Sequence, residues 1–312
     1  MLPGAHLPTV WGKKLRWRPP VHDRLERITT PDGDHLTLAR MGTPAPGVPH
    51  LLVLHGLEGN VKAKYAHGLL ELARQRGWSG DLLLFRTCDG EDCSARRLYH
   101  SGETTDLDFI VRWLVAKTPD VRIVVCGVSL GGNVLVKWLG EVGTEGRSLV
   151  HRAAAVSVPF DLGAGSRYLE RGFSRLYTRH FLSTLLPKAL RKLEQFPGAF
   201  DGGRARAATT FWEFDDAVTA PLHGFIGAAD YYDRSSSMPF IEAVRVPTLL
   251  FAARDDPFIP PAVLAKAAVL ASANNSVTID ITERGGHVGW IEGAVWPNGY
   301  YMELRVVNYL SL

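Results

Sequence analysis

A strand-like segment that runs directly into a glycine–serine turn is the feature that most constrains the fold. Residues 121–126 are apolar and rich in β-branched side chains, and Gly-Val-Ser-Leu-Gly follows at residues 127–131. The next stretch, residues 133–140, is compatible with a helix. A serine at the apex of such a turn is strained so that its hydroxyl is exposed, and only small residues fit two positions before and after it. This context makes Ser129 a candidate nucleophile, although the same pattern also arises by chance in a chain with 31 glycines.

Short apolar runs alternate with amphipathic stretches along most of the chain. Apolar runs predict strands at residues 51–54, 81–85, 121–126, 152–158, 246–252 and 276–281. Helical spacing or position predicts helices at residues 61–76 and 104–117, after Pro260-Pro261, and at 297–310. A Pro-Asp-Gly-Asp turn at residues 31–34 predicts a hairpin between residues 24–30 and 35–41. Strands that are apolar at nearly every position indicate a mostly parallel sheet covered by helices on both faces, which is the α/β class.

The alternation stops at Pro159 and resumes near residue 239. Between them, residues 160–238 contain amphipathic helical pieces, aromatics and many arginines, but no convincing buried strand. We therefore expect a helical cap inserted into a core formed by residues 23–159 and 239–312. Residues 1–22 show no clear periodicity and are expected to form an irregular N-terminal arm.

Composition excludes several classes of protein. A net charge of +3, 46% hydrophobic residues and 21% charged residues are typical of a globular protein and give no electrostatic footprint for nucleic acid. No apolar run approaches the ~20 residues that span a bilayer. The N-terminal arm lacks the hydrophobic core of a signal peptide. The chain has three cysteines, and so small and uneven a number fits a reducing compartment, so a cytoplasmic location is expected. The basic, aromatic residues 11–18 are expected to pack on the domain, with peripheral contact to anionic lipid or to an acidic partner as the alternative.

The cysteines are expected to stay unpaired. Cys126 ends an apolar strand and is expected to be inert core. Cys88 and Cys93 fall in a stretch that reads as a polar loop, where oxidative pairing is conceivable but not expected.

Serine is a weak nucleophile, so it needs a general base, and that base needs an acid to orient it. On a doubly wound sheet these follow in the order serine, acid, histidine. His287 lies in a Gly-Gly-His loop just after the last expected strand and is the candidate base. Two adjacent carboxylates, Asp255 and Asp256, follow the strand before it. We choose Asp256 as the acid because Pro-Phe-Ile-Pro follows it, and expect Asp255 to cap the loop or bind backbone amides.

Acyl transfer also needs donors for the oxyanion. The backbone amide of Leu130, the residue after the nucleophile, is one candidate. The second should come from the loop at residues 55–59, where the amide of Leu57 is the best candidate. His55 is expected to brace this loop by hydrogen bonding and not to act as a second base. This chemistry needs no cofactor and no metal ion.

Seven short motifs together resemble a known family, the α/β-hydrolase fold proteins of the YheT-like and ABHD1/ABHD2/ABHD3 group. They lie at residues 55–59, 99–104, 127–133, 156–162, 231–236, 253–258 and 285–290, and so extend over most of the chain. The resemblance implies an α/β-hydrolase fold and a serine hydrolase of esterase or lipase type, with Ser129, Asp256 and His287 as its triad. It also implies acyl-ester, phospholipid or acylglycerol substrates. One departure is Phe-Arg-Thr-Cys-Asp-Gly at residues 85–90, where the family usually has Phe-Arg-Gly-Cys-Ser-Gly.

The leading hypothesis is therefore hydrolysis of a small-molecule or lipid-like carboxylic ester through an acyl-enzyme. A second hypothesis is acyl transfer to an alcohol or amine, which shares every step up to the acyl-enzyme. A third is a ligand-binding protein that keeps the pocket without turnover. An intact triad argues against the third, because binding alone does not require all three side chains. The sequence does not indicate an oligomeric state or an acyl-chain length.

Overall fold

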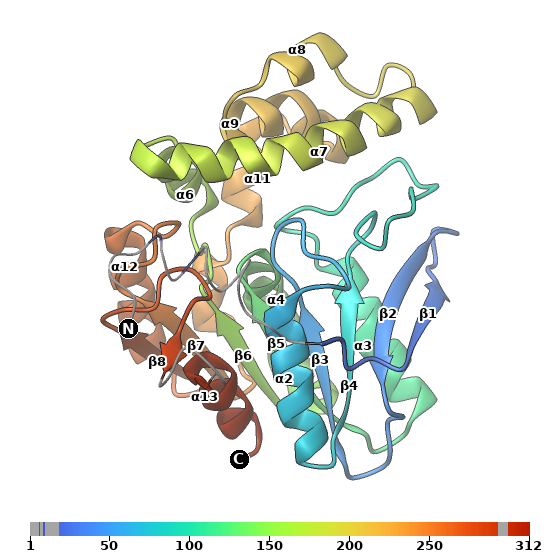
Figure 1. Ribbon diagram of the computed structural model, residues 1–312, viewed down its shortest axis with the longest axis vertical. Coiled ribbons are helices and arrows are strands. Elements are labelled where there is room, and N and C mark those ends of the chain that lie inside the picture. Colours follow the sequence, from blue (N-terminus) through green and yellow to red (C-terminus); the bar gives the residue numbers. More distant parts are fainter. Residues whose placement is uncertain (1–5, 7–8, 10–18, 293–298) are drawn as a thin grey trace.

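An eight-stranded sheet forms the centre of the protein, with strand order β1-β2-β4-β3-β5-β6-β7-β8 (Figure 1). The computed structural model describes residues 6, 9, 19–292 and 299–312. The strands are β1 (Arg24–Thr29), β2 (His35–Met41), β3 (Pro49–Leu54), β4 (Ser79–Leu84), β5 (Arg122–Val128), β6 (Arg152–Val156), β7 (Thr248–Ala253) and β8 (Val277–Thr282). The expectation for residues 11–18 and the start of the expected closing helix lie outside the described residues.

The sheet is mostly parallel, with antiparallel strands at one edge. β1 pairs antiparallel with β2, and β2 pairs antiparallel with β4, while the pairings from β4 through β3 to β8 are all parallel. The predicted hairpin is present, because Gly33 adopts a positive φ of 77° that closes the turn between β1 and β2. Since parallel strands all end at the same edge, the loops after β3, β5, β7 and β8 converge there.

Helices cover both faces of the sheet. One apolar core is built with residues of α3 (Thr105–Lys117), α4 (Leu130–Val142) and α12 (Pro261–Ser272). The core on the opposite face uses residues of α2 (Lys64–Gln75) and α13 (Tyr301–Leu310), which also pack against each other. The α/β-hydrolase architecture expected from the sequence is thus confirmed.

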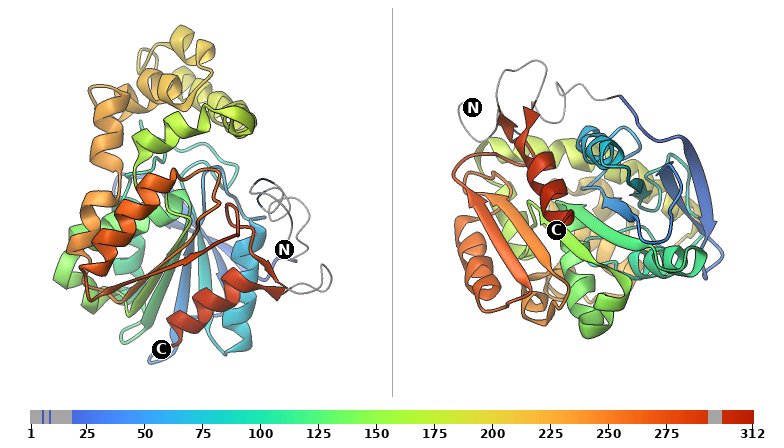
Figure 2. Two further views of the ribbon diagram at one scale, coloured as in Figure 1. Left: turned by 90° about the vertical axis from the view of Figure 1, so that its left-hand side faces the viewer. Right: turned by 90° about the horizontal axis from the view of Figure 1, so that it is seen from below.

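A group of helices lies above the carboxyl ends of the strands, between β6 and β7 in the chain (Figures 1 and 2). Its members are α6 (Leu162–Leu169), α7 (Arg175–Gln195), α8 (Gly202–Ala207), α9 (Phe211–Phe214), α10 (Ala220–His223) and α11 (Ala228–Ser235). They have an apolar cluster of their own, which includes Leu182, Phe200 and Phe214. No strand occurs between β6 and β7, a stretch that is described in full, as the sequence predicts.

Several boundaries differ from the sequence expectations. The helix expected from residue 61 begins at Lys64, and the strand expected to reach residue 158 ends at Val156, because Ser157 has a positive φ of 51°. A short antiparallel pair, β9 (Ile291–Glu292) and β10 (Gly299–Tyr300), carries no sequence pattern that predicts it. Two-residue strands are too short to show a periodicity.

The cysteines are free and buried. For Cys126 this agrees with the expectation, and burial raises the pKa of its thiol to about 12. Cys88 and Cys93 lie in a loop and are unpaired, as expected, but both residues are buried, at 4% and 2% exposed, which the polar sequence around them does not indicate. The helices above the sheet bury this segment: Lys192 of α7 donates to the backbone oxygen of Cys93.

Asn133, in the first turn of α4, ties two distant segments to the turn that carries Ser129. Its Nδ2 donates to the backbone oxygens of Ser101 and Ser235, both at 2.8 Å. Its Oδ1 accepts from the Ser237 amide at 3.0 Å, and the side chain is fully buried. This one amide group therefore joins the sheet core to the end of α11.

Replacing Asn133 with alanine should lower the free energy of unfolding by about 3 kcal/mol, because three buried backbone groups lose their partners. Urea unfolding checks this. Asn308→Ala is the control, since Asn308 is exposed and bonds only to exposed Arg76; its effect should stay within about 0.5 kcal/mol. Equal losses in the two variants would show that the Asn133 contacts are not important for stability.

Candidate active site

Ser129 occupies a strained backbone position between β5 and α4. Its φ of 55° and ψ of −118° are rarely adopted by a residue with a side chain. The surrounding glycines explain how the turn is accommodated. A Cβ on Gly127 would lie 2.3 Å from the Gly131 oxygen, and a Cβ on Gly131 would lie 2.6 Å from the Leu54 and His55 oxygens. The Gly-x-Ser-x-Gly string is therefore required by close backbone contacts here, and is not a chance match.

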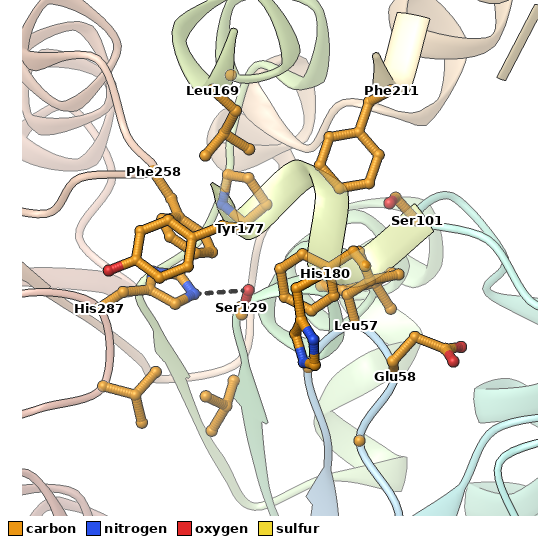
Figure 3. A pocket seen from close by; sticks show the side chains of 18 of the residues that line it. Leu57, Glu58, Ser101, Ser129, Leu169, Tyr177, His180, Phe211, Phe258 and His287 are labelled. Carbon is orange, nitrogen blue, oxygen red and sulfur yellow. Dashed lines mark hydrogen bonds between the residues drawn. The ribbon is translucent and has the colours of Figure 1, made fainter. Parts of the chain in front are cut away.

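Three side chains form a continuous hydrogen-bonded chain at the carboxyl edge of the sheet, and Figure 3 shows its contact between His287 and Ser129. His287 Nε2 lies 2.9 Å from Ser129 Oγ. His287 Nδ1 lies 2.8 Å from Asp256 Oδ2. The imidazole also stacks on Phe258, with ring centroids 4.2 Å apart. The structure thus brings together all three side chains that the sequence singled out, from loops after β5, β7 and β8.

The hydrogen-bond pattern fixes the roles that these groups can take. Asp256 is only 3% exposed, and its Oδ1 accepts from the Phe258 amide at 2.8 Å. A carboxylate accepts hydrogen bonds only, so Nδ1 carries the proton of the ring. Nε2 then presents its lone pair to the hydroxyl of Ser129. This is the arrangement required for a histidine to withdraw a proton from a serine.

Asp255 contacts the loop and not the imidazole. Its Oδ1 accepts from the amides of Gly285 and Gly286 at 2.9 and 2.8 Å. The His287 amide itself donates to Thr9 Oγ1 at 2.9 Å. The two adjacent carboxylates therefore have separate contacts, and Asp255 helps fix the backbone of the histidine loop. The Thr9 contact had no sequence signal, because it joins positions 278 residues apart.

The loop after β3 has one backbone amide without a hydrogen-bond acceptor among the described residues. Three of its amides are used within the protein: Gly56 to Tyr65 Oη, Glu58 to Tyr99 Oη and Gly59 to the Gly56 oxygen. Between them, the Leu57 amide has no acceptor in the described part of the chain. Leu130 is the first residue of α4, where helix amides lack intrahelical partners and the dipole is positive. Leu57 and Leu130 line the same cavity as Ser129.

His55 holds the loop after β3 in place by hydrogen bonds. Its ring is fully buried, Nδ1 donates to the Gly56 oxygen at 2.8 Å, and Nε2 accepts from the Phe85 amide at 3.1 Å. A Cβ on Gly59 would lie 2.6 Å from the ring, so glycine is required there. Burial lowers the pKa of His55 to about 4, which keeps the ring neutral. The geometry agrees with the expectation that His55 braces the loop.

A cavity of about 710 Å³ opens above Ser129 and His287 (Figure 3). Many of the apolar side chains in its walls come from the segment above the sheet, residues 160–238. They include Leu162, Leu169, Phe173, Leu176, Tyr177, Phe181 and Phe211. A cavity of this size and character suits an apolar ligand with a few polar groups at one end.

Thr87 marks the place where the chain departs from the usual family motif. It has a positive φ of 65° and lines a smaller cavity of about 80 Å³. That cavity is also lined by Leu57 and Leu130. The departure therefore lies beside the loop amides and leaves the contacts among Ser129, His287 and Asp256 unchanged.

A second serine–histidine–aspartate set lies deep in the protein. His50 Nδ1 is 2.8 Å from Ser79 Oγ, and His50 Nε2 is 3.0 Å from Asp81 Oδ2. These residues sit near the amino ends of β3 and β4, away from the edge that carries Ser129. All three are buried and none lines the cavity. Triad-like distances alone therefore do not define a reactive site.

Among the described residues, no group of three or more histidine, cysteine or acidic side chains could hold a metal ion. No helix in this part of the chain is long and apolar enough to cross a membrane.

Comparison with known proteins assigns the family. The model of the alpha/beta hydrolase fold family matches residues 49–294, and the chain belongs to this family. The chain is 40% identical to the Escherichia coli (strain K12) protein YheT, over 98% of this chain and 90% of that protein. It is 30% identical to the Mus musculus phospholipase ABHD3, over 94% of this chain and 74% of that protein. The expected resemblance to the YheT-like and ABHD group is confirmed.

More distant proteins extend this picture. The Saccharomyces cerevisiae monoacylglycerol lipase is 28% identical over 78% of this chain and 55% of that protein. Among solved structures, the Pyrococcus furiosus esterase Pf2001 is similar, with a TM-score of 0.60 and 18% identity over 92% of this chain and 91% of that chain. At this identity the structural match shows the shared fold.

Buried histidines make the stability of the protein sensitive to mild acid. Burial lowers the pKa of His55 and His223 to about 4 and that of His100 to about 3, from an ordinary 6.5. Between these values the unfolded chain binds more protons than the folded one, so the free energy of unfolding falls as pH drops from 6.5 toward 4. Urea unfolding at pH 7 and pH 5 should show a lower midpoint at pH 5. An equal or higher midpoint would contradict neutral burial of these rings.

Proposed function

We propose that this protein is a serine hydrolase that cleaves carboxylic esters with an apolar acyl chain through an acyl-enzyme intermediate. The observation that carries the proposal is the hydrogen-bonded chain from Asp256 through His287 to Ser129 at the base of an apolar cavity. This arrangement resembles the template of ester and amide hydrolysis in its geometry and in the order of its residues along the chain.

Acylation begins with attack of Ser129 Oγ on the ester carbonyl carbon. His287 Nε2 takes the hydroxyl proton as the Oγ–C bond forms, and the carbonyl π electrons move onto the oxygen. Asp256 stabilises the imidazolium and holds the ring in the required tautomer. The proton then passes from His287 to the leaving alkoxide as the C–O bond breaks, which leaves the acyl group on Ser129. Water repeats the sequence and releases the acid.

The amides of Leu57 and Leu130 are proposed to bind the oxyanion in both steps. Backbone donors that are already oriented need no rearrangement when the charge develops, and each such donor contributes about 3 kcal/mol in related enzymes. The strained backbone of Ser129 supports this role, because it places the hydroxyl and the start of α4 at one point.

The substrate class follows from the cavity and from the relatives. The walls of the cavity are mainly apolar, while Ser129, His287 and the loop amides supply polar groups at its base. The matched relatives are named phospholipase ABHD3 and monoacylglycerol lipase, which are enzymes of acyl lipids. We therefore propose a lipid-like acyl ester as substrate. On this account the helices of residues 160–238 are a cap that forms the acyl pocket over a core of residues 23–159 and 239–312.

The first test is turnover of p-nitrophenyl esters of increasing chain length. Ser129→Ala should lower kcat by about 10,000-fold or more, because the nucleophile is lost. Ser79→Ala is the matched control, since Ser79 also contacts a histidine but lies outside the cavity; its kcat should stay within about twofold of the wild type. Full activity in Ser129→Ala, or loss of activity in Ser79→Ala alone, would refute the mechanism.

The second test separates the two adjacent carboxylates. Asp256→Asn should lower kcat by about a thousandfold or more, because asparagine favours the wrong histidine tautomer. Asp255→Asn keeps an oxygen that accepts from the Gly285 and Gly286 amides, so its kcat should fall by about tenfold at most. Steady-state kinetics of the two variants checks this. A larger loss in Asp255→Asn would show that the acid is wrongly assigned.

A further inference from the structure

Glu58, the residue after Leu57, is held in an uncommon backbone conformation by a small polar cluster. Its φ is 54°, a value that costs free energy for a residue with a side chain. Its amide donates to Tyr99 Oη at 2.9 Å, and the same hydroxyl donates back to Glu58 Oε1 at 2.8 Å. Since Glu58 directly follows Leu57, these contacts restrain the chain next to the Leu57 amide.

Lys188, on helix α7 above the sheet, contacts this cluster. Its Nζ lies 2.8 Å from Glu58 Oε1. The side chains are 17% and 8% exposed, so solvent screens the pair weakly. Leu57 and Glu58 lie together beside the cavity (Figure 3). A single lysine thus links a cap helix to the loop that carries the Leu57 amide.

We propose that Lys188 is a positioning residue, which through Glu58 holds the Leu57 amide in the orientation that receives the oxyanion. The proposal rests on the proposed function, because it assigns a role to the amide that this function uses. It also means that the active site is completed only when α7 is seated on the core. The cap then contributes to the rate of the reaction as well as to substrate binding.

The charge of Glu58 adds a second reason for the lysine. An unpaired, poorly solvated carboxylate next to Leu57 would oppose the negative charge that develops on the substrate oxygen. Lys188 neutralises that charge within the cluster. Loss of the lysine should therefore weaken binding of the transition state more than binding of the uncharged ester.

The same helix offers a matched control. Arg191, one turn further along α7, pairs with Asp92 of the core at 3.0 Å. This pair also ties the helix to the core, but it has no contact with Leu57 or Glu58. A variant at Arg191 therefore shows how the kinetics change when an ion pair between α7 and the core is lost without any change near Leu57 and Glu58.

The experiment measures kcat and KM for a p-nitrophenyl ester, together with inhibition by an alkyl trifluoromethyl ketone. Ser129 Oγ attacks the carbonyl carbon of the ketone, and His287 Nε2 takes the hydroxyl proton. The carbonyl π electrons move onto the oxygen, and the resulting hemiketal anion mimics the oxyanion of ester cleavage. Lys188→Met should lower kcat by about tenfold or more with KM unchanged, and the inhibition constant of the ketone should rise by a similar factor. Lys188→Arg should recover most of the loss, because arginine can still reach a carboxylate.

Arg191→Met should leave kcat, KM and ketone inhibition within about twofold of the wild type. Lys188→Met and Arg191→Met with equal kcat would overturn the role of Lys188, as would a Lys188→Met effect confined to KM. A loss of kcat that Lys188→Arg does not recover would overturn it too, because the charge could not then be the cause. No turnover in the wild type would instead overturn the proposed function, and the positioning role with it.

Discussion

The strained backbone of Ser129 is the constraint on which the rest of the structure depends. A positive φ at a residue with a side chain persists only when the surrounding structure holds it. Here the glycines of the turn permit the required close contacts, and the Ser129 amide donates to the Val156 oxygen at 2.8 Å. The strain raises the hydroxyl above the sheet edge and starts α4 directly beneath it. The Ser129 hydroxyl, the start of α4 and the neighbouring loops consequently meet at one point.

The edge of the sheet and the helices above it contribute different side chains to the site. Parallel strands bring the loops of Ser129, Asp256 and His287 to one edge, where their polar groups find each other. The helices of residues 160–238 lie over this edge and supply many of the apolar side chains that line the cavity. Both parts also touch the loop after β3, through Tyr99 from the core side and Lys188 from the cap. The contact between the helices of residues 160–238 and the core is therefore part of the proposed site.

Local patterns predicted the sheet, its covering helices and the three central side chains. Each of these leaves a local signal, such as apolar runs, glycine spacing or a histidine after the last strand. The contacts of Thr9, Tyr99 and Lys188 were not predicted, because they join distant positions and depend on tertiary packing. The burial of Cys93 was missed for the same reason, since the cap covers a stretch whose local composition is polar.

Covalent labelling of the native protein with an alkyl fluorophosphonate, followed by peptide mapping, tests the central claim most directly. The probe should form one adduct, on Ser129, and labelling should be abolished in His287→Ala because the hydroxyl is then no longer activated. The buried Ser79, which has a histidine partner of its own, should remain unlabelled. An adduct at another residue, or labelling of Ser129 at an unchanged rate without His287, would contradict the account.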